Sequence, residues 1–268
     1  MKRVLVINSM VAYSHVGITA QLPVFTQAGI EATVLPCGLF SANLAFPQTA
    51  VSDASQWLIA ALKQYEGMAV SFDGICIGML EKKEVIFSLL PYLHLHVSAI
   101  KVIDPVFADH GAYYRGFDET YVQALSQLIP YFDVMTPNMS EACFLMGENP
   151  KEIFAWQTLL KKMAGRFQIQ VVITGVQLDE DQSHLYILYG DEKQAQTIKI
   201  PKEQDYCGAG DVFSALLCRE LIEGKRMGEA VASAVFTLQG LFADALKKHR
   251  DPLMGLPLYE KAPFPDEG

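Results

Sequence analysis

The residues best suited to chemistry are Gly208, Ala209, Gly210 and Asp211, which precede an apolar helical pattern over 211–223. Glycines permit positive φ and have no side chain that would block an anion, and the first amides of a helix favour negative charge. A carboxylate beside such a site repels the bound anion, so its presence there indicates a chemical role. Asp211 is suited to take a proton from a hydroxyl that attacks phosphorus. The alternative is a glycine-rich turn with Asp211 as an ordinary N-cap.

A second candidate pair, Asn138 and Glu141, follows a short strand predicted over 132–135. Residues at i and i+3 share one face of a helix. In the first turn after a parallel strand, that face points toward the sheet edge where ligands of α/β proteins bind. A single carboxylate there is sufficient for Mg²⁺, which keeps several of its waters. The alternative is a capping box, with Asn138 as N-cap and Glu141 at the N3 position.

Three further polar residues stand at the ends of predicted strands: Ser9, Asp104 and Thr174. Pro105 stops the strand before Asp104 and fixes the direction in which the chain leaves it. Because parallel strands end at one edge of a sheet, we expect these residues near Asn138. An ordinary Asp-Pro turn and a capping serine are the alternatives for Asp104 and Ser9.

The elements that must position these residues alternate between strand and helix, which predicts an α/β fold with a mostly parallel central sheet. The predicted strands are 3–8, 31–36, 73–78, 99–103, 132–135 and 169–174. The predicted helices lie near 15–29, 53–65, 82–96, 118–130, 138–147, 151–165 and 227–247, with a hairpin over 184–200. Expected N-caps are Asp53, Asp118 and Asn138, and expected helix stops are Gly29 and Gly147. We expect one domain over 1–268.

Composition excludes several classes of protein. The chain has 268 residues and a net charge of −9 without a basic run, which argues against nucleic acid and an anionic membrane surface. No apolar run reaches the roughly 20 residues of a membrane span, and the N-terminus is expected to be a strand rather than a signal peptide. The chain has neither a Walker nor a dinucleotide-binding glycine loop. Its five cysteines form no Cys-x-x-Cys pair and suggest buried thiols in a reducing cytoplasm.

Gly-Ala-Gly-Asp at the start of a late helix resembles the ribokinase superfamily, and so do the Asn-x-x-Glu and Asp-Pro-Val segments. The resemblance covers almost the whole chain and implies a three-layer α/β/α fold. It also implies that ATP phosphorylates a small alcohol, with Asp211 as base and the amides of residues 208–210 as anion hole. By the same resemblance ATP contacts Asp104, Asn138, Glu141, Thr174, Gly208 and Gly210. Mg²⁺ is then held by Asp104 and Glu141 through water, and the loop 107–116 is similar to a flap over ATP.

Residues 8–17 resemble pyridoxal kinases, which phosphorylate pyridoxal, pyridoxamine or pyridoxine on the 5′-hydroxymethyl group. The resemblance implies that Ser9 contacts the pyridine ring and that the enzyme is a homodimer. Leu44 and Met79 stand at substrate-binding positions where many members have threonine and tyrosine. The preferred vitamer and the need for a monovalent cation are left open.

Two other functions compete with a vitamin B6 kinase. Many hydroxymethylpyrimidine kinases carry a cysteine in the anion-hole motif in place of the aspartate-containing pattern, so Asp211 favours the B6 branch. A non-catalytic B6-binding protein is suggested by Leu44 and Met79. The presence of Asp211 and Glu141 counts against that interpretation.

Overall fold

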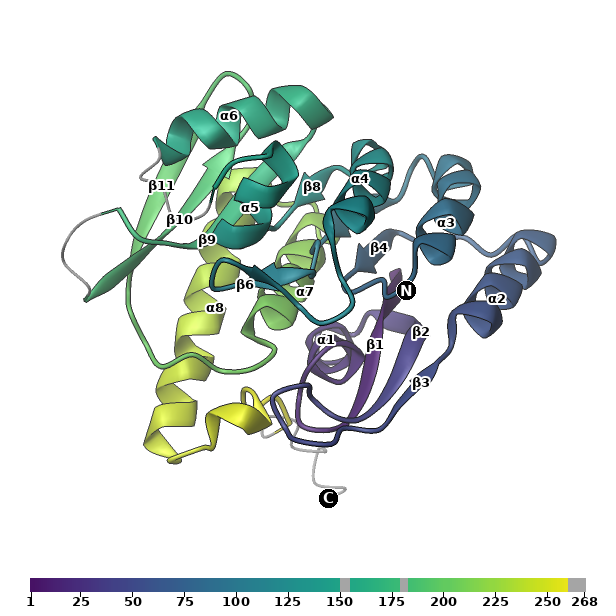
Figure 1. The fold of residues 1–268 in the computed structure, drawn as a ribbon, viewed down its shortest axis with the longest axis horizontal. Helices are drawn as coiled ribbons and strands as arrows, with labels where there is room; N and C mark the ends of the chain where they lie inside the picture. The colour runs from purple at the N-terminus through teal and green to yellow at the C-terminus, as the bar shows by residue number, and fades with distance from the viewer. Residues whose placement is uncertain (150–154, 179–182, 260–268) are drawn as a thin grey trace.

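The computed structural model, which describes residues 1–149, 155–178 and 183–259, has three layers, with helices on both faces of a central sheet (Figure 1). In these residues nine strands form one sheet in the order β11-β10-β9-β8-β5-β4-β1-β2-β3. The strands from β9 to β2 in this order pair in parallel, whereas β3, β10 and β11 are antiparallel to their neighbours. The predicted three-layer α/β/α architecture with a mostly parallel sheet is therefore confirmed.

The central strands are short and buried. The sheet consists of β1 (Arg3–Tyr13), β2 (Glu31–Ala42), β3 (Val51–Asp53), β4 (Gly74–Ile77), β5 (Ile100–Ile103), β8 (Val134–Met135), β9 (Gln170–Val176), β10 (His184–Gly190) and β11 (Ala195–Pro201). A separate hairpin pairs β6 (Ala108–Asp109) with β7 (Ala112–Tyr113). The predicted hairpin over 184–200 is confirmed as β10 and β11. The short strand β3 was not predicted, because all its residues are exposed and show no apolar alternation.

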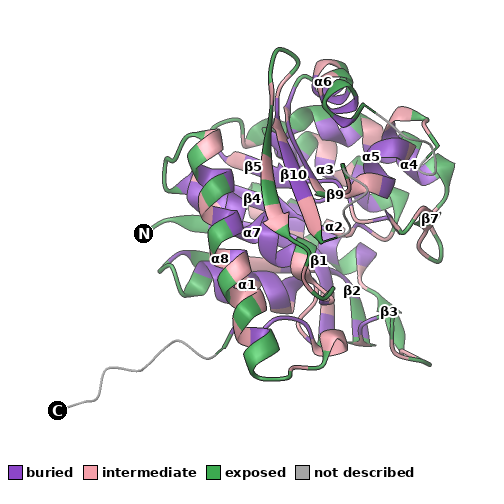
Figure 2. Ribbon diagram, turned by 90° about the vertical axis from the view of Figure 1, so that its left-hand side faces the viewer, coloured by how far each residue is buried: buried purple, intermediate pink, exposed green. Residues whose placement is uncertain are grey.

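The helices divide between the two faces of the sheet. One core contains residues of α2 (Ser55–Gly67), α3 (Lys83–Leu95), α4 (Glu119–Leu128), α5 (Met139–Met146) and α6 (Trp156–Phe167). The other contains α1 (Ile18–Thr26), α7 (Ala209–Ile222) and α8 (Met227–Lys247). In β1, Leu5 and Ile7 face the first core and Val4 and Val6 the second, as expected when side chains alternate along a strand. Figure 2 shows the buried central strands between the helical layers.

The helix ends confirm several predicted caps and correct others. Asp118 and Asn138 accept N–H groups of their helices as N-caps, and Gly147 ends α5 in the left-handed conformation. Asp53 is not an N-cap, because α2 begins two residues later; its carboxylate accepts the N–H of Ser55 at 2.8 Å. Gly29 lies in the turn beyond the end of α1. Of the helix predicted over 151–165, residues 151–154 lie outside the described part of the chain.

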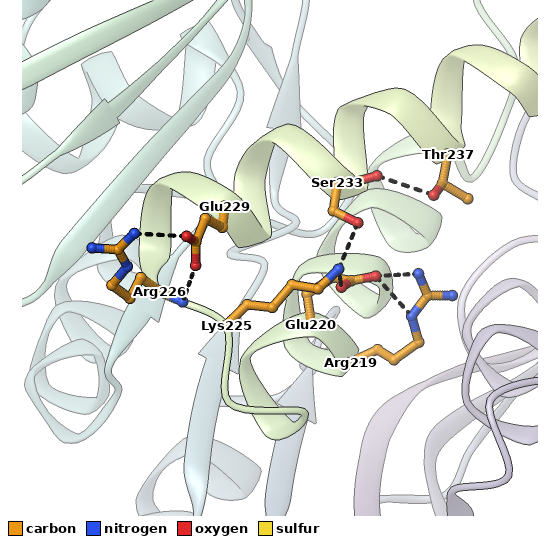
Figure 3. A network of polar contacts seen from close by, with 7 residues as sticks. All are labelled: Arg219, Glu220, Lys225, Arg226, Glu229, Ser233 and Thr237. Atoms are coloured by element: carbon orange, nitrogen blue, oxygen red, sulfur yellow. Dashed lines mark hydrogen bonds and ion pairs between the residues drawn. The ribbon is translucent and has the colours of Figure 1, made fainter.

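A buried carboxylate fixes the turn between α7 and α8 (Figure 3). Glu220 is 4% exposed and pairs with Arg219 and Lys225, while Lys225 also donates to the Ser233 hydroxyl at 3.0 Å. Helix α8 is long and apolar enough, by length and composition alone, to cross a membrane, although polar residues such as Glu229 and Asp244 interrupt its apolar sequence. Its side chains nevertheless pack with α7 in the second core.

Candidate active site

The predicted anion loop lies at the carboxyl edge of the sheet. Helix α7 contacts β4 and β5, and its N-cap Gly208 is left-handed, with φ of +76°. A Cβ atom at Gly208 would lie 2.3 Å from the carbonyl oxygen of His15, so only glycine fits this close approach. The loop before α1 and the start of α7 therefore meet at this point.

Asp211 is held on both carboxylate oxygens. Its Oδ1 accepts a hydrogen bond from the Asn8 amide at 2.8 Å, and its Oδ2 accepts one from the Gly17 N–H at 2.9 Å. The residue is 9% exposed, and burial raises the pKa of its carboxyl group, whereas the Gly17 and Asn8 donors lower it. These donors favour the ionised carboxylate that a general base requires.

Asp104 lies beside the anion loop, as predicted. It directly follows β5, and a Cβ atom at Gly210 would lie 3.4 Å from its Oδ2. Burial, followed by the negative charges of Glu141 and Asp211, raises the pKa of the Asp104 carboxyl well above its usual value. Carboxylates that raise one another's pKa form a site that favours a cation.

The chemistry of this set fits Mg²⁺ held through water. Among the described residues, no three His, Cys, Asp or Glu side chains are grouped so that they could ligate a metal together. Mg²⁺ retains several waters and is often held by one or two carboxylates and the phosphates of its substrate. Asp104 and Glu141 are therefore suited to contact the ion's waters rather than to enclose it.

The structure places Asn138, Glu141 and Thr174 together, and it confirms the capping interpretation of the first two. Asn138 accepts the Glu141 N–H at 3.0 Å, and the Glu141 carboxylate accepts the Asn138 N–H at 2.9 Å. The Phe107 N–H donates to the other oxygen of Glu141 at 3.2 Å, and burial raises the pKa of this carboxyl to about 8. Thr174 forms a parallel bridge with Asn138. Capping does not remove Glu141 from the site, because its carboxylate also anchors the first residue of the predicted flap.

The three predicted substrate residues are positioned in different ways. Ser9 is buried under Gly17, where an added Cβ atom would lie 2.6 Å from the serine hydroxyl. The N–H of Met79 donates to the side-chain oxygen of Asn8 at 3.0 Å, so the backbone of Met79 is close to the group that holds Asp211. Leu44 is 51% exposed in the turn after β2.

Residues 251–259, which we call the C-terminal strap, join the loops around the site. The N–H of His15 donates to the Met254 carbonyl at 3.1 Å, and the N–H of Cys207 donates to the Pro252 carbonyl at 3.0 Å. The Asn43 amide donates to the Leu253 carbonyl at 2.6 Å, which ties the turn of Leu44 to the same segment. Figure 1 shows this yellow end of the chain beside the purple loop before α1.

Sequence reasoning missed the contributions of the strap, Asn8 and Gly17. The strap has no regular structure beyond a short turn at Pro252–Met254, and only the alternation of Leu256 and Leu258, which are both buried, indicates that it packs. Asn8 precedes the predicted substrate serine, and only its position at a strand end could have identified it. Gly17 was expected inside a helix, but its φ is +62° and it is the N-cap of α1, which begins at Ile18.

Comparisons with known proteins agree with this architecture. The profile of the phosphomethylpyrimidine kinase family matches residues 14–252. The structure of pyridoxal kinase from Lactobacillus plantarum is 27% identical, with a TM-score of 0.90 over 97% of this chain and 94% of that one. Pyridoxal kinase from Leishmania donovani in complex with ADP and pyridoxamine is 22% identical, with a TM-score of 0.82 over 96% of this chain and 93% of that one.

A relative named for a different substrate matches the same region of the chain. A hydroxymethylpyrimidine/phosphomethylpyrimidine kinase from Staphylococcus aureus is 23% identical over 94% of this chain and 92% of its own length. The family profile and the fold thus agree, whereas the relatives differ in substrate. The chain belongs to the phosphomethylpyrimidine kinase family and is an ATP-dependent kinase with a ribokinase-like fold.

Proposed function

We propose that the protein transfers the γ-phosphoryl group of ATP to the 5′-hydroxymethyl group of pyridoxal, pyridoxamine or pyridoxine. With pyridoxal the product is pyridoxal 5′-phosphate. The observation that carries the proposal is the Asp211 carboxylate, held on both oxygens at the start of a helix that opens with a glycine-rich loop. The similarity to pyridoxal kinases from Lactobacillus plantarum and Leishmania donovani supports this substrate class.

In the proposed reaction Asp211 accepts the proton of the substrate hydroxymethyl group, while the oxygen of that group attacks the γ-phosphorus. The new oxygen–phosphorus bond forms as the bond to the bridging oxygen of ADP breaks. The amides of Gly208 and Gly210 donate to the developing negative charge. The N–H of Ala209 contributes less than predicted, because it donates to the Tyr206 carbonyl at 3.2 Å.

The remaining residues bind and orient the substrates. In this proposal Ser9, Leu44 and Met79 would contact the alcohol, and Asn138 and Thr174 would contact the nucleotide. Asp104 and Glu141 would hold Mg²⁺ bound with ATP through its waters, and the ion would supply neutralisation of phosphate charge. The homodimer is proposed from the resemblance alone, and the cytoplasmic location from the five cysteines.

Hydroxymethylpyrimidine kinase activity is the second candidate. The matching family profile and the Staphylococcus aureus relative favour it. The substrate would be another small aromatic ring with a hydroxymethyl group, so the same base and anion loop would serve. Asp211 in place of the cysteine of many such enzymes favours the B6 alcohols.

The test measures ADP formation from ATP and Mg²⁺ with pyridoxal, pyridoxamine, pyridoxine and hydroxymethylpyrimidine offered separately. We expect the highest kcat/KM with one of the three B6 alcohols, together with the appearance of its 5′-phosphate. Turnover of hydroxymethylpyrimidine alone would show that the proposed substrate is wrong and would leave the proposed mechanism unchanged. Binding of B6 alcohols without ADP formation would show a non-catalytic binding protein.

A further inference from the structure

The side-chain amide of Asn8 is buried and has all its hydrogen-bonding positions filled. Asn8 lies in β1 and is 1% exposed. Its Oδ1 accepts the N–H groups of Ser9 at 2.8 Å and Met79 at 3.0 Å. Its Nδ2 donates to the Asp211 carboxylate at 2.8 Å and to the Gln21 side-chain oxygen at 3.1 Å. An asparagine amide offers two donors and two acceptor positions, and all four are used here.

These partners fix which way the amide points. Backbone N–H groups can only donate, so the atom that faces Ser9 and Met79 must be the oxygen, and the NH₂ group must face Asp211. The backbone of Gly78 packs closely against this NH₂ group, because an added Cβ atom would lie 2.2 Å from Nδ2. A flipped or displaced Asn8 amide would leave buried donors facing one another, which is costly.

Gln21 and Ser214 join Asn8 to the backbone of Asp211. Both residues are fully buried. The Gln21 amide donates to the Ser214 hydroxyl at 3.3 Å, and that hydroxyl donates to the Asp211 carbonyl at 3.0 Å. A closed ring of polar contacts therefore links β1, α1 and α7. Such a satisfied network in a low-dielectric interior gives its members a single arrangement.

We propose that Asn8 is a positioning residue that holds the Asp211 carboxylate in the orientation needed to accept the substrate proton, and that Gln21 and Ser214 lock Asn8 in place. The inference rests on the proposed function, because it takes Asp211 as the base. Asn8 anchors Oδ1 and the Gly17 N–H anchors Oδ2, so the carboxylate cannot rotate about its side-chain bond without losing both donors. The orientation is thus set before any substrate binds, which is the preorganisation that proton transfer benefits from.

The test is Asn8→Asp, which keeps the size and the accepting oxygen but replaces the NH₂ donor by a second oxygen. Two facing carboxylates either repel or share one proton, and in both cases Asp211 is no longer a free, oriented base. We expect kcat to fall about 10- to 100-fold, as for a lost hydrogen bond to a charged group, with KM for ATP changed less than about twofold. An unchanged kcat would overturn the proposal.

Glu220→Gln is the control, because it exchanges a carboxylate for an amide at another buried side chain, in α7, the helix that carries Asp211. Glu220 lies near the end of α7, whereas Asp211 lies in its first turn. We expect a lower midpoint of urea unfolding and a kcat within about twofold of the original chain. An equal loss of kcat in both variants would reduce the role of Asn8 to general stability and overturn the proposal.

Two further measurements keep the test independent of folding yield and of substrate identity. Asn8→Ser, with folding checked by circular dichroism, removes the same donor and must show a comparable loss of kcat. Crystal structures of the original chain and Asn8→Asp must show the Asp211 carboxylate rotated only in the variant. This readout needs no turnover, so an inactive original chain would refute the proposed function, whereas an unmoved carboxylate would refute the role of Asn8.

Discussion

The two sides of the candidate site differ in how firmly their residues are held. On the side of the base, Asp211 is 9% exposed and has a donor on each oxygen. On the side of the alcohol, Leu44 is 51% exposed in a turn, and Met79 is fixed through its backbone rather than its side chain. Proton transfer requires fixed groups, whereas the choice of ring depends on apolar side chains that can be exchanged without disturbing the base.

This difference parallels the one between the fold, which the relatives share, and the substrate, in which they differ. The base, the anion loop and the capping box form a frame built by several elements, in which the carboxylates of Asp211 and Glu141 are buried. The residues predicted to contact the ring lie at strand ends and in a turn. The relatives are named for different substrates although they match the same chain, as expected if the frame carries the reaction and the turns carry the specificity.

Asp211→Asn should have the largest effect, because it removes the base while preserving the shape of the side chain. We expect kcat to fall by roughly 10²–10⁴ and ATP binding to persist. Steady-state ADP release and equilibrium ATP binding measure the two quantities. The exposed Asp205→Asn serves as control and should keep kcat; normal turnover in Asp211→Asn would exclude Asp211 as the base.

Gly255→Ala tests whether the frame depends on the C-terminal strap. An added Cβ atom would lie 2.5 Å from the His15 carbonyl oxygen and 2.9 Å from that of Cys207, so the strap must move away from both loops. We expect kcat to fall about tenfold, because a small displacement of catalytic groups is costly. Gly29→Ala is the control: its φ of +69° matches the +71° of Gly255, and its Cβ atom would meet nothing within 4 Å. Similar kcat values for the two variants would show that the strap has no part in positioning.

Met79→Tyr and Leu44→Thr should alter preference rather than turnover. They introduce the residues frequent in pyridoxal kinases, and new contacts to one ring typically change relative kcat/KM by about 3- to 100-fold. The measurement is kcat/KM for each B6 alcohol and for hydroxymethylpyrimidine. A fall in kcat of the same size for every alcohol would mean that these side chains act on the frame.

The pH dependence of stability should reveal the buried acid Glu141. Its folded pKa of about 8 lies above the ordinary value of 4.5, so its protonation stabilises the fold below pH 4.5 and this contribution is lost as pH rises through 8. Without Mg²⁺, we expect the free energy of unfolding to fall by about 1 kcal/mol or more between pH 5 and pH 8.5.

Urea unfolding at both pH values compares the original chain with Glu141→Gln and with Glu31→Gln, an exposed control on β2. The glutamine amide introduced by Glu141→Gln can still accept the Asn138 N–H as part of a capping box, so loss of the cap does not confuse the comparison. We expect a smaller change with pH in Glu141→Gln only. If the free energy of unfolding of Glu141→Gln changed with pH as much as that of the original chain, the pH dependence would come from other acidic residues.

Local patterns predicted the elements and most of the site. Short apolar runs bounded by turn residues identified the parallel strands, and the Asn138 and Asp118 caps followed from residue type and spacing. The helix start near residue 15 and the cap at Asp53 were wrong, because the Gly17 N–H is held by Asp211 and the short strand β3 pairs with β2, which are contacts beyond one helical turn. Helix propensity contains no information about such contacts.

The sequence by itself determined the α/β architecture and the glycine-rich loop, and it predicted Asp211 as the base, because each depends on residue types at short spacing. Only the tertiary structure showed that Asn8 and Gly17 hold Asp211 from about 200 residues away and that the strap closes over the same loops. The physical reason is that a buried carboxylate needs donors, and any nearby element can supply them. Which element does so is decided by how the helices pack on the sheet.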